Sequence, residues 1–172
     1  EVDGKPVTRL ANAQEGLAYG IEGGLGVRLW QLTLAASAAW MRADVEEPDG
    51  GSTPAPWIPP FFGTAALRWD HPGRRYYAEA FVRWATRQDR LNARDLKDPR
   101  ICETSPFSGE LQDPCDGTPG WVTLNLRAGW RIEEWLTARL SLHNLTDARY
   151  RTHGSGLDAP GFDARLHLDA SF

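Results

Sequence analysis

The sequence predicts an all-β protein, an antiparallel sheet of about eight strands that forms a segment of a transmembrane β-barrel. Apolar residues alternate with small or polar ones over seven segments of the 172-residue chain, and this alternation is typical of strands with two different environments. The connections between these segments are alternately short and long, as in membrane β-barrels. The chain also has eight tryptophans, and tryptophan favours the boundary between membrane and water.

The first two strands are expected at residues 17–29 and 30–40. Apolar residues and glycines occupy most odd positions of the first segment, and apolar residues occupy the even positions of the second. The parity changes between Leu29 and Trp30, which predicts a very tight turn at that point. A less regular segment near residues 6–11 is the candidate for an eighth strand.

The middle pair of strands is expected at residues 61–69 and 76–84, where apolar residues again occupy every second position. Residues 70–74 include adjacent proline and glycine and supply the turn between the two strands. The opposite positions of both segments carry arginine, glutamate and threonine. We therefore expect one face of this hairpin to meet lipid and the other to meet water or protein.

The last three strands, at residues 122–130, 136–142 and 164–172, show the clearest alternation, and the chain ends on Phe172 of the apolar face. The long connections are expected at residues 44–60, 86–120 and 147–161. Counted back from the end, the short turns share one side of the membrane with the C-terminus, which should be periplasmic. The tryptophans fit two aromatic girdles, with Trp30, Trp69, Trp130 and Trp135 beside the short turns and Trp40, Trp57, Trp84 and Trp121 towards the long loops.

Several classes of protein are disfavoured. The formal charge of −4 gives no basic surface for nucleic acid. No apolar run approaches the roughly 20 residues that a transmembrane helix requires. We find no Gly-rich phosphate loop, nucleophile elbow or histidine pair at metal-binding spacing, so we predict no enzyme, no cofactor and no resident metal. The first residues lack a secretory signal, so an exported protein would carry that signal upstream.

The C-terminal part resembles the end of TonB-dependent outer-membrane receptors. Residues 144–150 read NLTD followed by a tyrosine, a proline-glycine pair stands at residues 160–161, and a terminal aromatic follows. Four upstream segments are similar to the branch that takes up haem or binds haemoglobin or transferrin, at residues 58–63, 88–91, 98–101 and 117–120. In that family a barrel of 22 strands encloses an N-terminal plug, and a TonB box receives energy from the inner membrane.

The resemblance implies that residues 1–172 are the C-terminal section of such a barrel, with the plug absent from this chain. The expected function is TonB-energised uptake of a scarce nutrient, such as an iron complex or haem, across the outer membrane of Gram-negative bacteria. The implied partners are outer-membrane lipid, the remainder of the barrel, the plug, TonB and the barrel assembly machinery. Two alternatives stay open: a standalone eight-stranded barrel for passive permeation, adhesion or structure, and a soluble β-domain.

Ligand capture is expected in the long loops at residues 86–120 and 147–161. Loop carboxylates could gather Ca²⁺, although aspartates that form turns explain them more simply, and a loop histidine could contact haem iron. Arginines on the inner face could serve an anionic substrate, but salt bridges are their simpler use. The candidate ligand-binding residues are Tyr150, His153, Asp95 and Asp98.

Three further expectations concern cysteines, histidines and the last strand. Cys102 and Cys115 lie in a segment rich in proline, glycine and aspartate, where we expect a disulfide in preference to two free thiols. Zinc is disfavoured without nearby histidines. His143 and His167 fall on inner positions of adjacent strands, where they could pair across the strands or contact the plug. The resemblance implies that the assembly machinery reads the last strand through Leu166, Leu168, Ala170 and Phe172.

Overall fold

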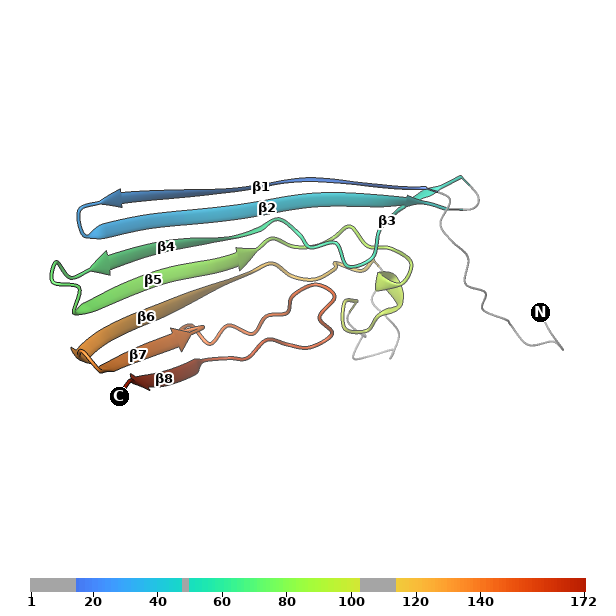
Figure 1. Ribbon diagram of the computed structural model, residues 1–172. Helices are drawn as coiled ribbons and strands as arrows, with labels where there is room; N and C mark the ends of the chain where they lie inside the picture. Colours follow the sequence, from blue (N-terminus) through green and yellow to red (C-terminus); the bar gives the residue numbers. More distant parts are fainter. Residues whose placement is uncertain (1–14, 48–49, 103–113) are drawn as a thin grey trace.

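The protein forms one antiparallel β-sheet of eight strands, seven long and one short (Figure 1). The computed structural model describes residues 15–47, 50–102 and 114–172. The strand expected near residues 6–11 lies outside the described residues. In the described part of the chain, no helix has the length and apolar character needed to cross a membrane.

The strands occur in the sheet in the order β1-β2-β4-β5-β6-β7-β8, and the short β3 pairs with β2. One turn of 3-10 helix, η1 (Asp95–Lys97), is the only helical segment among the described residues. The strand bounds are β1 Gly16–Leu29, β2 Leu32–Glu46, β3 Ser52–Pro54, β4 Phe62–Asp70, β5 Tyr76–Ala85, β6 Trp121–Glu133, β7 Leu136–His143 and β8 Asp163–Ala170.

The all-β antiparallel fold is confirmed, with differences at some strand ends and one additional short strand. β2 continues six residues past the expected end at residue 40, and β3 forms inside the connection expected at residues 44–60. The extension of β2 pairs with β1 on one side and with β3 on the other, so backbone hydrogen bonds hold it where the apolar alternation has ended. β8 ends at Ala170, two residues before the expected end.

One face of the sheet is apolar across every long strand, because the register aligns the apolar positions. Leu25 pairs with Ala36, Ala36 with Ala65, Ala65 with Val82, and Val82 with Leu124. Paired residues point to the same side of a sheet. Leu25 is 69% exposed on this face, and a continuous exposed apolar sheet is the expected lipid-facing surface of a membrane barrel.

The opposite, inner face carries paired charges in its centre. Glu79 of β5 lies between two arginines of the neighbouring strands, 3.9 Å from Arg68 and 3.6 Å from Arg127. The Arg68 guanidinium also lies 3.7 Å from the ring centroid of Tyr77. These contacts follow the cross-strand register, so salt bridges and cation–π contacts occupy these arginines.

The side chains of the inner face differ in size between the two halves of the sheet. On β1 and β2 the face includes Gly24, Gly26 and Ala35, and the space above Gly26 is open. On β5 and β6 it carries larger groups, and the Tyr77 ring covers Gly129 so closely that a Cβ there would overlap the ring. The inner surface is therefore shallow at one side and filled at the other.

The expected pairing of His143 with His167 is wrong. His143 lies opposite Asp163, whereas His167 lies opposite Arg139, because the register of β7 and β8 separates the two histidines by four residues. Nε2 of His167 lies 3.0 Å from Asp169 of the same strand. The cross-strand neighbour of each of these histidines is therefore a charged residue and not the other histidine.

The short turns and the C-terminus share one end of the sheet, as expected, and the long loops gather at the other end (Figure 1). Trp69 and Tyr76 contact each other near the short turns, with ring centroids 5.7 Å apart, as in an aromatic girdle. Two tryptophans differ from the girdle expectation. Trp121 lies on the inner face against Tyr150, and Trp57 lies in the loops beside Gly154.

The sheet is open in the part of the chain that the structure describes. β1 and β8 are its edges, and no residues of these strands contact each other. Free backbone groups at an edge cannot be left unpaired in lipid, so a membrane barrel must close. The described residues therefore form an open sheet, and a closed eight-stranded barrel is not seen among them.

Candidate ligand-binding site in the loops

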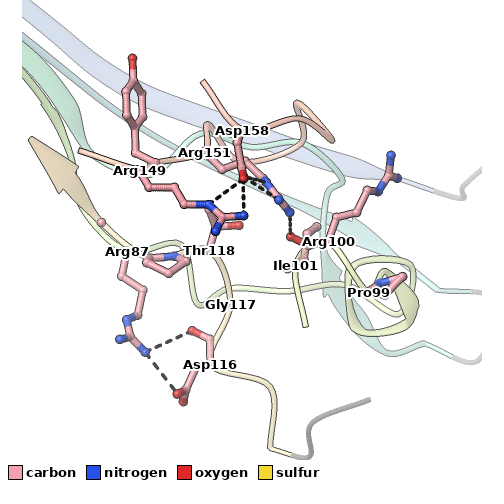
Figure 2. Close-up of a pocket in the computed structure, with 13 residues that line it drawn as sticks. Arg87, Pro99, Arg100, Ile101, Asp116, Gly117, Thr118, Arg149, Arg151 and Asp158 are labelled. Carbon is pink, nitrogen blue, oxygen red and sulfur yellow. Dashed lines mark hydrogen bonds and ion pairs between the residues drawn. The ribbon is translucent and has the colours of Figure 1, made fainter. Parts of the chain in front are cut away.

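A cavity of about 570 Å³ lies at the loop end of the sheet (Figure 2). The ring of Trp121 packs on Tyr150, with ring centroids 4.3 Å apart, and Trp121 shares the inner face with Thr123 of the same strand. The cavity therefore opens beside the inner face. Its lining contains Arg87, Arg100, Ile101, Asp116, Thr118, Arg149, Tyr150, Arg151 and Asp158, with the proline and glycine residues of the same loops.

A disulfide fixes the longer loop beside this cavity. Cys102 and Cys115 are bonded, with Cα atoms 5.1 Å apart and a sequence separation of 13 residues. Cys102 is 1% exposed, and its Sγ lies 3.4 Å from the carbonyl oxygen of Asp95. The bond therefore joins the segment after η1 to the segment that leads into β6.

Beneath the cavity, three side chains from distant parts of the sequence meet. Nδ1 of His153 lies 2.9 Å from Oγ1 of Thr118, and Nε2 of His153 lies 4.0 Å from Oδ2 of Asp95. The side chains of His153 and Asp95 are 1% and 3% exposed. Burial lowers the pKa of His153 from its ordinary value, and the nearby Asp95 carboxylate partly opposes that effect. We refer to Asp95, Thr118 and His153 as the loop junction.

Local hydrogen bonds explain why Asp95 takes this position. Oδ1 of Asn92 accepts hydrogen bonds from the backbone N–H groups of Arg94 and Asp95, at 2.8 and 3.1 Å. Oδ2 of Asp95 in turn accepts one from the N–H of Asn92, at 3.1 Å. This reciprocal arrangement of side chains and backbone starts η1 in the way that polar residues start helices.

The four predicted ligand-binding residues have separate surroundings. Tyr150 lines the cavity. Asp98 accepts hydrogen bonds from both Nε and Nη2 of Arg100, at 2.7 and 2.6 Å, and this arginine lowers the pKa of Asp98 to about 2. Asp95 and His153 face each other in the buried loop junction, so neither presents its side chain to the cavity. Their role as ligand-binding residues stays a prediction.

No metal site is visible among the described residues, since no group of three or more His, Cys, Asp or Glu side chains gathers there. The residues that the sequence reasoning missed are the arginines of the cavity. Arg149 and Arg151 flank Tyr150 in the chain, and both donate to Asp158, through their Nε atoms at 3.0 and 2.9 Å. The Arg-Tyr-Arg pattern at these positions was the available signal for a charged cavity wall.

The residues of the expected assembly signal lie at the sheet edge. Leu166 and Leu168 of β8 are on the apolar face and are 69% and 61% exposed. Phe172 follows β8, and its ring centroid lies 5.9 Å from that of Trp135. The strand is thus accessible on its apolar face, and its reading by the assembly machinery stays a prediction.

A comparison with protein-family models identifies the fold family. Residues 2–145 match the model described as "TonB dependent receptor-like, beta-barrel". The chain belongs to the TonB-dependent receptor family. A search of curated proteins found no match.

Solved structures of two metal transporters share the fold of the chain. One is named "Copper transporter OprC", with a TM-score of 0.69 and 18% identity over 91% of this chain. Another is the FrpB iron transporter from Neisseria meningitidis in its apoprotein form, with a TM-score of 0.70 and 18% identity over 94% of this chain. The chain spans 23% and 25% of those two structures, about a quarter of each barrel protein. Both names describe transporters.

Proposed function

We propose that the chain is part of the wall of an outer-membrane transporter that imports a scarce nutrient with energy supplied through TonB. The observation that carries this proposal is the match of residues 2–145 to the receptor barrel family. The continuous apolar face supports a position in lipid, and the paired charges on the other face support an interior filled by water or protein.

The remaining partners follow from the same proposal. The two open edges of the sheet, β1 and β8, would pair with other strands of the barrel. The inner face would contact a plug domain, and TonB would act on a region outside this chain. The barrel assembly machinery would recognise β8, whose apolar residues are exposed.

The proposed cargo is an iron complex or haem, captured by the loops. The cavity of about 570 Å³ is within the range of small-molecule sites. The loops that line it lie at the end of the sheet opposite the short turns (Figure 1). In the closed arrangement both ring nitrogens of His153 face protein groups. Coordination of haem iron by His153 would therefore require the loop junction to open, whereas an iron complex could bind at the cavity wall directly.

Uptake by intact cells tests the function. Cells that carry the receptor should accumulate radioactive iron from an iron chelate or from haem, and cells without its gene should accumulate much less. An inactive TonB or an uncoupler should abolish the difference, because the energy comes from the inner membrane. Uptake of equal size in the presence of an uncoupler would contradict the proposal and would support passive permeation. The matched control is Arg74→Gln, because residue 74 lies in a short turn between β4 and β5, at the end of the sheet away from the long loops. This variant should take up iron as the wild type does.

A further inference from the structure

The cavity wall has more basic than acidic groups. Four arginines line it, and the lining contains two carboxylates, Asp116 and Asp158. Arg100 is held by Asp98 outside the lining, and Arg151 is held by Asp158 and by the carbonyl oxygen of Arg100. The other two arginines are held less firmly, because Arg149 contacts a single carboxylate oxygen, Oδ2 of Asp158, and Arg87 has one long hydrogen bond to a backbone carbonyl oxygen.

Asp158 occupies a position in which two guanidinium groups meet. Arg149 reaches its Oδ2 from Nε and Nη2, both at 3.0 Å, and Arg151 reaches its Oδ1 from Nε and Nη2, at 2.9 and 2.6 Å (Figure 2). The Asp158 side chain is 33% exposed and that of Arg149 is 88% exposed. Two guanidinium groups around one carboxylate are the usual protein arrangement for binding an oxyanion, and here a carboxylate of the protein fills it.

On another part of the cavity wall, Arg87 has weaker contacts with the protein than Arg149 has. Nη1 of Arg87 donates one long hydrogen bond, of 3.4 Å, to the backbone carbonyl oxygen of Asp116 and lies 3.7 Å from the carboxylate of the same residue, and the two side chains are 51% and 70% exposed. An exposed pair at this distance contributes little to stability. Arg87 can therefore turn to a ligand at small cost.

We propose that this cavity binds a compact ligand with two or more carboxylates, and that one ligand carboxylate replaces Asp158 on Arg149 while another binds Arg87. The inference rests on the proposed function and names the chemical class of the cargo. Free polycarboxylates and metal chelates that they form share this chemistry. Replacement of Asp158 would release one contact that holds the loop after β7, because Asp158 ties Arg149 and Arg151 together.

Calorimetric titration of the intact receptor in non-ionic detergent tests the inference. The probes are citrate and iron(III) citrate, and trimethyl citrate is the uncharged control of the same skeleton. Wild-type receptor should bind citrate or iron(III) citrate, or both, and should not bind the ester. A preference between the first two identifies whether the free acid or the chelate is the source of the carboxylates.

Variants separate recognition from loop structure. Arg87→Gln and Arg149→Gln should each weaken binding by about tenfold or more, because a charge-assisted hydrogen bond is lost. Asp158→Asn should strengthen binding several-fold, because the competing charge is removed, whereas a purely structural role would predict weaker binding. Arg87→Gln leaves the Asp158 contacts intact, so its result holds even if Asp158→Asn disturbs the loop. Arg74→Gln should bind as wild type does.

Three results would contradict polycarboxylate binding at this cavity. The inference is overturned if the wild-type receptor binds neither citrate nor iron(III) citrate, or if the ester binds equally well. It is also overturned if Arg87→Gln and Arg149→Gln bind with wild-type affinity. Titration in detergent requires no energy source, so the two experiments are independent. Energised iron uptake without citrate binding would contradict this inference and would still support the proposed function. Citrate binding without energised uptake would support polycarboxylate binding and would contradict the proposed function.

Discussion

Two neighbouring alanines of β2 allow a direct test of which face meets lipid. Ala36 is on the apolar face, opposite Leu25 and Ala65, and Ala35 is on the inner face, opposite Gly26. Both positions have the same residue type and nearly the same depth. Ala36→Arg and Ala35→Arg therefore differ almost only in the environment that receives the charge.

The expected cost follows from the depth of Ala36. It lies four residues beyond Leu32, the first residue of β2, which pairs with Trp69 of the aromatic girdle. At about 3.3 Å per residue and a tilt of about 40°, this is roughly 10 Å along the membrane normal, near the centre of an apolar band about 25 Å tall. Arginine near the midplane costs about 2–4 kcal/mol, which is roughly a 100-fold change in the folding equilibrium.

Ala35→Arg should cost about 1 kcal/mol or less, as surface substitutions commonly do, because the space above Gly26 is open. The assay is the urea dependence of the folded fraction of the receptor in phospholipid vesicles, read from its heat-modifiable migration in gels. A larger cost for Ala35→Arg than for Ala36→Arg would refute the assignment of the faces. Equal costs would show that neither face meets hydrocarbon.

Three further predictions concern the loops and the inner face. Replacing both cysteines by serine should destabilise the closed loop by about 3 kcal/mol on a chain-entropy estimate, seen as faster proteolysis there, and unchanged cleavage would contradict this. Gly129→Ala should cost about 1–3 kcal/mol because the new Cβ meets the Tyr77 ring, whereas Gly26→Ala should leave the urea midpoint nearly unchanged. Burial lowers the pKa of His153, so docking of its loop is fully stable above about pH 6.5 and weakens as the pH falls through that value towards the folded pKa. The hydrogen-exchange protection of that loop, corrected for the intrinsic pH dependence of amide exchange, should therefore decrease at low pH in the wild type and should be independent of pH in His153→Gln.

Much of the sheet could be predicted because a strand between lipid and the barrel interior has a period of two in its side chains. The signal fades where the environment becomes uniform. Beyond residue 40, β2 no longer has a lipid face, and its extension depends on pairing with β1 and β3. The position of Trp121 was visible in the sequence, since it has the parity of Thr123 and Asn125, but its aromatic character suggested a girdle.

The candidate site was less predictable because it depends on contacts between loops. Asp95 and His153 are 58 positions apart, and no periodic pattern in the sequence reports that they meet in a buried junction. The histidines of β7 and β8 were misplaced for a related reason. The connection between these strands is long, so its length does not fix their register.

The uneven inner face has a consequence for whatever packs against it. At the centre of β1 and β2, glycine and alanine leave the backbone almost bare, whereas phenylalanine and arginine on β5 and β6 cover the backbone with side chains. A domain seated inside would approach the bare side closely and would stand off from the filled side by about the thickness of an aromatic ring. The filled side could then adapt to its neighbour by rotamer changes of its side chains while the backbone stays still.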